Sequence, residues 1–159
     1  MVKIAVDGTM AVMKACQQAG VERCVITSSF AAMYNVAEEN RPKDNIFNET
    51  YFSDAERPEG MNEYEKSKVL AEKAAWDFQK ALPEASKFEI VTINPGFIMG
   101  PPLRKEECTS TGFVKFFMLG NMPSISYHHL CAVDVRDVAD AHLLAIKNPK
   151  VANRRFILS

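Results

Sequence analysis

The chain has 159 residues, of which 47% are hydrophobic, and its 19 basic and 20 acidic side chains leave a formal net charge of −1. This length predicts one domain, and the balanced charge argues against nucleic acid or an anionic membrane as a partner. The longest apolar run, Phe88 to Met99, is too short and too polar to span a bilayer, and Met1 is not followed by a secretory leader, so we expect a cytoplasmic protein.

The N-terminal third predicts a helix followed by a strand. Hydrophobic residues recur at helical spacing over Thr9–Ala19, with Asp7 as a candidate cap and Gly20 as a stop. Residues 2–6 alternate like a strand, so this stretch is open between a strand and the approach to the helix. Cys24–Ile26 is a short β-branched run without alternation, as in a strand covered on both faces.

A long surface excursion and a second helix come next. Asn35–Gly60 is rich in Asn, Pro, Asp and Glu and has little periodicity, which predicts a long loop. Asn62 can cap a helix with Glu65 completing a capping box, and the helical pattern runs to Leu82 before Pro83 ends it.

The remaining pattern alternates strands with helices. It predicts, in order, a strand at Phe88–Asn94, a turn over 95–102, a helix at Thr111–Leu119 ending at Gly120, a strand at Cys131–Val133, a helix at Val135–Lys147 and a strand at Arg155–Leu158. Such alternation implies parallel βαβ units and an α/β fold.

One tyrosine and one lysine stand four positions apart in the predicted second helix. Tyr64 and Lys68 would therefore project from the same face, one turn apart. An ammonium about 4 Å from a phenolate stabilises it by roughly 4 kcal/mol at an effective dielectric near ~20, enough to help a phenol exchange protons near neutral pH. The plainer alternative is a solvated helix face.

Two predicted strands end in residues suited to a site. The first ends at Thr27-Ser28-Ser29 and the second at Asn94-Pro95-Gly96, and ligands of open α/β sheets bind outside the carboxyl ends of strands. We expect these ends and the Tyr64 helix to line one crevice. The serines could instead only satisfy a strand end, and the proline-glycine pair could be only a turn.

Four segments together resemble a known family. Residues 21–34 (VERCVITSSFAAMY), 64–68 (YEKSK), 93–102 (INPGFIMGPP) and 133–146 (VDVRDVADAHLLAI) are similar, in order, to blocks of the extended short-chain dehydrogenases/reductases of the NAD-dependent epimerase/dehydratase superfamily. The similarity is greatest to the dihydroflavonol-reductase-like group. It implies a Rossmann-like doubly wound parallel sheet and an oxidoreductase that acts on a carbonyl or secondary alcohol with NADP or NAD.

The resemblance also implies roles for individual residues. Tyr64 would exchange a proton with the substrate oxygen, Lys68 would stabilise the phenolate and bind the nicotinamide ribose, and Ser29, or alternatively Ser28, would hold the substrate oxygen. Tyr64 and Lys68 would also contact the cofactor, together with Thr27, Pro95, Gly96, Phe97, Ile98 and, across a variable loop, Ser110.

This chain differs from the family in lacking the glycine-rich turn of the family's N-terminal half. Its seven glycines form no glycine-rich turn that could bring backbone amides onto a pyrophosphate. We therefore expect residues 1–159 to be a single, incomplete NAD(P)-binding domain with a bared sheet edge. The missing N-terminal half would complete it, and pairing of helices between subunits, as in the family, would allow a homodimer.

Two rival functions and one rival site are open at this point. A sugar-nucleotide epimerase or dehydratase uses the same tyrosine and lysine, and a catalytically silent remnant would instead act as a protein-interaction module. His128-His129-Leu130-Cys131 superficially offers metal ligands but has no fourth partner, so we expect structural histidines and no metal. The four cysteines show no paired spacing and are expected to be reduced thiols.

Overall fold

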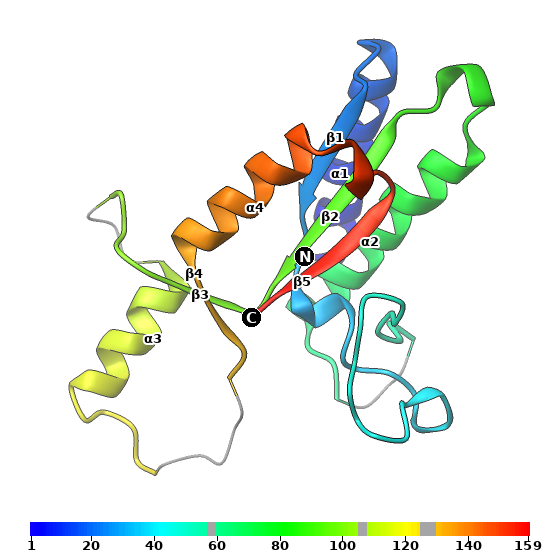
Figure 1. The fold of residues 1–159 in the computed structure, drawn as a ribbon. Helices are drawn as coiled ribbons and strands as arrows, with labels where there is room; N and C mark the ends of the chain where they lie inside the picture. The colour runs from blue at the N-terminus through cyan, green and yellow to red at the C-terminus, as the bar shows by residue number, and fades with distance from the viewer. Residues whose placement is uncertain (57–59, 105–107, 125–129) are drawn as a thin grey trace.

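A three-stranded parallel sheet lies at the centre of the computed structural model, which describes residues 1–56, 60–104, 108–124 and 130–159 (Figure 1). Strand β2 (Glu89–Pro95) lies between β1 (Arg23–Thr27) and β5 (Arg154–Leu158) and is buried from Ile90 onward. Both pairings are parallel. This confirms the predicted α/β class, and among the described strands β1 is an edge strand that pairs only with β2.

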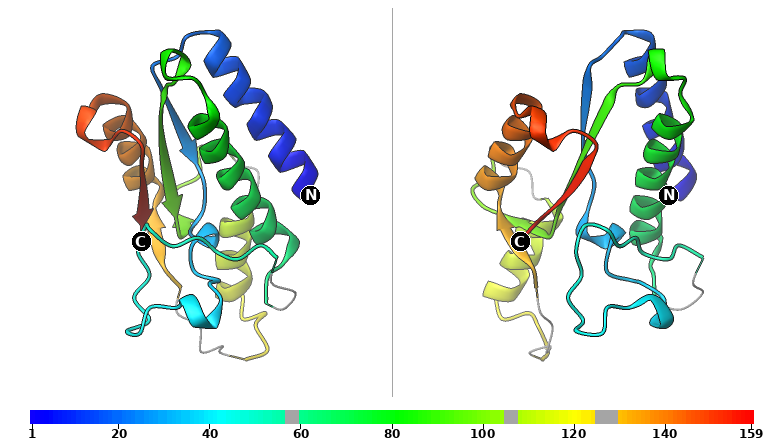
Figure 2. Two further views of the ribbon diagram at one scale, coloured as in Figure 1. Left: turned by 90° about the vertical axis from the view of Figure 1, so that its right-hand side faces the viewer. Right: turned by 45° about the vertical axis from the view of Figure 1, so that its right-hand side comes forward.

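Helices cover both faces of this sheet. Helices α1 (Val2–Gln18) and α2 (Glu63–Ala81) pack against each other on one face, and α4 (Val135–Lys147) lies on the other (Figure 2). The strand at the sheet edge is tied to α4 by Arg23, whose Nη1 donates to the carbonyl of Ala145 at 2.7 Å. The result is the three-layer arrangement expected of parallel βαβ units.

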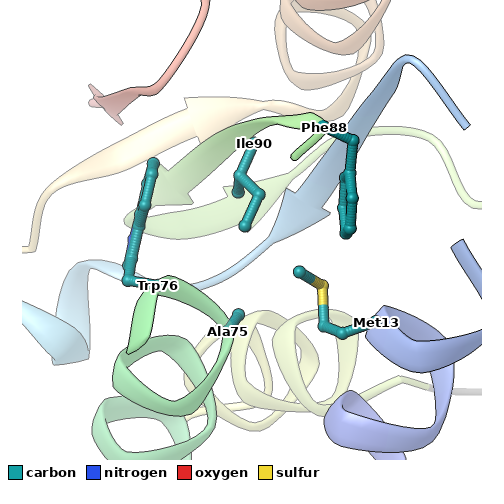
Figure 3. Packing of buried hydrophobic residues seen from close by; sticks show 5 residues of the cluster. All are labelled: Met13, Ala75, Trp76, Phe88 and Ile90. Atoms are coloured by element: carbon teal, nitrogen blue, oxygen red, sulfur yellow. The ribbon is translucent and has the colours of Figure 1, made fainter. Parts of the chain in front are cut away.

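The side chains of β2 point alternately to the two faces of the sheet, as strand geometry requires, so the core has a part on each face. On one face Ile90 packs with Phe88, Met13 of α1, and Ala75 and Trp76 of α2, whose side chains point toward one another in Figure 3. On the other face the core contains Val91, Ile93 and Ala145 of α4. Further along the α2-facing side of β2, Thr92 and Asn94 are fully buried polar residues, so this face changes from apolar to polar toward the carboxyl end of the strand.

A second, two-stranded sheet stands beside the first. Strand β3 (Phe97–Met99) pairs in parallel with β4 (Ala132–Asp134), and helix α3 (Thr109–Met118) lies between them in sequence. The sequence pattern predicted only a turn where β3 lies. A three-residue strand is too short to show alternation, and the partner that makes it a strand is more than thirty residues away.

The N-terminal helix begins earlier than predicted. Residues 2–6 are helical, so the strand alternative for them is wrong, and Asp7 lies inside α1 instead of capping it. The side chains of Lys3 and Asp7 form an i,i+4 ion pair that favours this extra helical turn. The predicted stop is confirmed, because Gly20 has a φ of +63°, the left-handed conformation that ends many helices.

Most other elements lie where the sequence placed them. Helix α4 has the predicted bounds, α2 begins with the predicted capping box and ends one residue before Leu82, and α3 begins two residues early. Four short 3-10 helices occupy loops: η1 (Phe30–Ala32), η2 (Glu38–Asn40), η3 (Glu84–Ser86) and η4 (Pro149–Val151). The described part of the excursion from Asn35 contains only η2. None of the described helices combines the length and the apolar character needed to cross a membrane.

Candidate functional site

The first two turns of α2 carry the candidate proton donor and its cation. The Asn62 Oδ1 atom accepts from the Glu65 backbone N–H at 3.0 Å, and a Glu65 carboxylate oxygen accepts from the Asn62 N–H at 2.9 Å, which fixes the start of the helix. Tyr64 is 50% exposed, and the Lys68 Nζ lies 5.7 Å from the centroid of its ring. The pair therefore shares one helix face, with the phenol accessible from outside.

The two serines after β1 have different environments. Ser28 is buried, and its hydroxyl donates to the carboxylate of Glu72 on α2. Ser29 is half-buried and caps η1, where its Oγ accepts from the Ala31 N–H at 3.2 Å. An accepting hydroxyl keeps its own proton to donate. The geometry therefore favours Ser29 over Ser28 as the residue that could meet a substrate oxygen.

A tyrosine links the Ser29 segment to the start of α2. The Tyr34 hydroxyl donates to Glu65, and the Tyr34 ring stacks on Phe30 with centroids 5.3 Å apart. Burial, and secondarily the Glu65 carboxylate, raise the pKa of Tyr34 well above its usual range, so the phenol stays a proton donor to Glu65. The segment that holds Ser29 is thus fixed to the helical turn next to Tyr64.

The ends of β1 and β2 lie side by side. Thr27 pairs with Ile93 in register, and the Ser28 N–H donates to the Ile93 carbonyl at 2.8 Å. The side chain of Thr27 is bound on the α4 side, where its Oγ1 lies 2.7 Å from Nε2 of His142. Pro95 is buried at the end of β2 and joins Gly96, whose N–H donates to Leu158 of β5.

Of the remaining predicted cofactor contacts, Ile98 and Ser110 lie at a separate pocket, and Phe97 of β3 packs edge-to-face against Phe113 of α3 with ring centroids 5.4 Å apart. This pocket, of about 1120 Å³, lies between β3, α3 and the first turns of α4, and Ile98 and Ser110 both line it. Its described lining is mainly apolar and includes three basic residues and no acidic one: Arg104, Lys115 and Arg136. Neither Tyr64, Lys68 nor Ser29 is among the described lining residues, so the predicted site residues fall into two groups.

The rim of this pocket carries a thiol whose reactivity can be predicted. Cys108 is exposed, and hydrogen bonding with Thr111 lowers the pKa of its thiol. Burial, with a smaller contribution from neighbouring Cys16, raises the pKa of Cys24 to about 11. Because the thiolate is the nucleophile, we expect iodoacetamide at pH ~8 to modify Cys108 at least about ten-fold faster than Cys24.

Peptide mass spectrometry of timed samples measures both rates in one reaction. Cys108→Ser should remove the fast labelling of the peptide that contains residue 108 and leave the slow labelling of Cys24 unchanged, while the exposed Cys131 is followed on its own peptide. Faster modification of Cys24 than of Cys108 would contradict the assigned environments.

The predicted histidine pair is not part of the described structure, since His128 and His129 lie outside the described residues. Within the described ranges, no group of three or more His, Cys, Asp or Glu side chains is placed to hold a metal ion.

Sequence reasoning missed a buried carboxylate behind the candidate site. Glu72 is 2% exposed and accepts hydrogen bonds from both the Ser28 hydroxyl and the Asn94 side chain. The available signal was its spacing, four residues after Lys68 and eight after Tyr64, which places all three on one face of α2.

The chain matches a known protein family over nearly its whole length. The model of the 3-beta hydroxysteroid dehydrogenase/isomerase family matches residues 1–155. NADPH-dependent methylglyoxal reductase GRE2 of Saccharomyces cerevisiae is 35% identical over 97% of this chain and 48% of its own length. Cinnamoyl-CoA reductase CAD2 of Medicago truncatula is 36% identical over 97% of this chain and 46% of its own length.

Solved structures agree with the fold. The crystal structure of yeast methylglyoxal/isovaleraldehyde reductase Gre2 complexed with NADPH superposes with a TM-score of 0.78 and 31% identity, covering 100% of this chain and 50% of the yeast chain. The chain thus spans about half the length of the curated relatives it matches.

Proposed function

Because the chain belongs to the 3-beta hydroxysteroid dehydrogenase/isomerase family, we propose that the native gene product carrying it is a reductase that converts small carbonyl compounds to alcohols with NADPH or NADH. The reductase names of two relatives, at 35% and 36% identity, support this choice over an epimerase. The single observation that carries the proposal is the accessible phenol of Tyr64 with the Lys68 ammonium beside its ring, next to the capped turn that holds Ser29.

Three residues of this chain have separate roles in the proposed reaction. Ser29 donates a hydrogen bond to the substrate oxygen, and Tyr64 gives that oxygen a proton as the carbonyl becomes an alcohol. Lys68 stabilises the phenolate that remains. When bound, the reduced nicotinamide supplies the hydride. The accessible phenol and the ammonium on one helix face fit the acid and the cation that this chemistry requires.

Further residues would hold the cofactor at the sheet ends. The backbone at Thr27 and the Pro95–Ile98 segment would flank the nicotinamide, and Ser110 would reach a phosphate from the pocket beside α3. The basic side chain of Arg104 at that pocket suits an anionic group, whereas Arg136 is already paired with Asp134. Since this chain has no glycine-rich turn for a pyrophosphate, residues 1–159 would supply one incomplete domain, completed along the open side of β1.

The test is a direct assay of the native gene product. With methylglyoxal as the probe, we expect consumption of NADPH, followed by its absorbance, and formation of an alcohol product. NADPH binding without net consumption would favour the epimerase alternative. Absence of binding of both NADPH and NADH would favour the protein-interaction alternative and end the reductase proposal.

A further inference from the structure

A single buried carboxylate joins the helix that carries Tyr64 to all three strands of the main sheet. Glu72 on α2 is 2% exposed, and its two oxygens accept hydrogen bonds from five side chains. The donors are Ser28 Oγ after β1, Thr92 Oγ1 (3.2 Å) and Asn94 Nδ2 (2.8 Å) on β2, Arg155 Nε (2.7 Å) on β5, and Trp76 Nε1 (3.2 Å) on α2 itself.

This carboxylate contacts both halves of the candidate site. On α2 it follows Lys68 by one turn and Tyr64 by two, on the same helix face. Toward the sheet it holds the Ser28 hydroxyl and the Asn94 amide, and the same Asn94 Nδ2 donates to the Ser29 carbonyl at 3.1 Å. Glu72 therefore connects α2 to the Ser29 segment through Asn94, in addition to the hydrogen bond between Tyr34 and Glu65.

The cationic partner Arg155 donates to Oε1 of Glu72, whereas Ser28 and Asn94 donate to Oε2. The Arg155 side chain is 8% exposed, and its Nη1 donates to the carbonyls of Glu49 (2.8 Å) and Tyr51 (2.5 Å). Its guanidinium lies 3.6 Å from the ring centroid of Phe52. Because a planar fork with this many partners has little freedom, Arg155 gives Glu72 a fixed counter-ion.

We propose that Glu72, held by Arg155, is a positioning residue that sets the placement of the Tyr64–Lys68 pair relative to Ser29. The inference rests on the proposed reductase function. Glu72 touches neither substrate nor cofactor in this assignment and acts through the residues that do.

A buried ion pair also stabilises the fold, so the test needs a readout that stability alone does not move. In carbonyl reduction the rate falls at high pH as the proton donor is lost, and a nearby ammonium moves this loss to lower pH. Displacing Lys68 from Tyr64 therefore moves the midpoint of the alkaline fall in kcat upward. Removing the negative charge of Glu72 without any displacement moves the midpoint downward, so the two effects have opposite signs.

The experiment compares Glu72→Gln and Arg155→Lys in the native gene product, with methylglyoxal and NADPH as probes. For Glu72→Gln we expect kcat to fall about 10- to 100-fold and the midpoint of the alkaline fall in kcat to rise by about half a pH unit or more. Arg155→Lys keeps the positive charge but loses the planar guanidinium group. A rise in the alkaline midpoint of kcat in this variant would therefore come from a change in geometry and not from a change in charge.

Ile90→Val is the matched control, since it removes one methylene from the buried core beside α2 and leaves the Glu72 contacts intact. It should lower the unfolding midpoint without moving the pH profile. Should Glu72→Gln fail to fold, Arg155→Lys decides the question. An inactive wild-type protein would overturn the reductase function and this inference together, whereas an active wild type with an unchanged or lowered midpoint in the variants would overturn the positioning role alone.

Discussion

Tyr64→Phe is expected to lower the kcat of the native gene product for methylglyoxal by about 10³-fold, while the Kd for NADPH changes by less than about two-fold. The substitution removes only the hydroxyl that would pass its proton to the substrate oxygen. The ring and its contact with Lys68 remain, because the ammonium lies 5.7 Å from the ring centroid. Stopped-flow measurement of NADPH oxidation, with a separate fluorescence titration of NADPH binding, gives both quantities.

Tyr51→Phe is the control for this prediction. It removes the same atom from a half-buried tyrosine in the loop between η2 and α2, outside the candidate site. We expect its kcat to match that of the wild type. Undiminished turnover in Tyr64→Phe would remove the phenol from the proposed reaction.

Gly96→Ala is expected to reduce the free energy of unfolding by at least about 3 kcal/mol. A Cβ at this position would lie 2.2 Å from the carbonyl oxygen of Cys131 and 3.0 Å from its carbonyl carbon. That oxygen also accepts the Phe97 N–H at 2.6 Å, so relief of the clash would separate β3 from the strand that follows Cys131. Urea denaturation followed by circular dichroism measures the loss.

Gly8→Ala provides the opposite case within the same chain. Gly8 lies inside α1, and a Cβ there meets no atom within 4 Å. Because alanine favours a helix over glycine, we expect this variant to be stabilised by about 0.5–1 kcal/mol. Equal stability of Gly96→Ala and the wild type would contradict the close approach of these two backbone segments.

The fold was predictable wherever the controlling interactions are local in the chain. The capping box of Asn62 and Glu65 defined the start of α2, and the helical pattern from Val135 to Lys147 defined α4 to the residue. The strand-like alternation of residues 2–6 was misleading, because they belong to α1, a helix that packs against α2 more than forty residues away. Strand β3 depends on a partner distant in sequence and therefore left no pattern.

In the candidate site, too, the features set by nearby residues were predictable and those set by distant residues were not. The spacing of Tyr64 and Lys68 was sufficient to place them on one helix face. Spacing could not choose between Ser28 and Ser29, since the direction of each hydroxyl depends on the turn after β1 and on a carboxylate more than forty residues away. Glu72 itself reads as an ordinary helix residue until the strands that bring its donors are in place.

The chain contains one tryptophan, and this residue is bonded to that carboxylate: the Trp76 indole N–H donates to Glu72. Tryptophan emission from residues 1–159 therefore originates from a single, buried side chain behind the proposed reaction centre. A spectroscopist needs no engineered dye, because a change in polarity or ionisation around Glu72 alters the wavelength at which Trp76 emits.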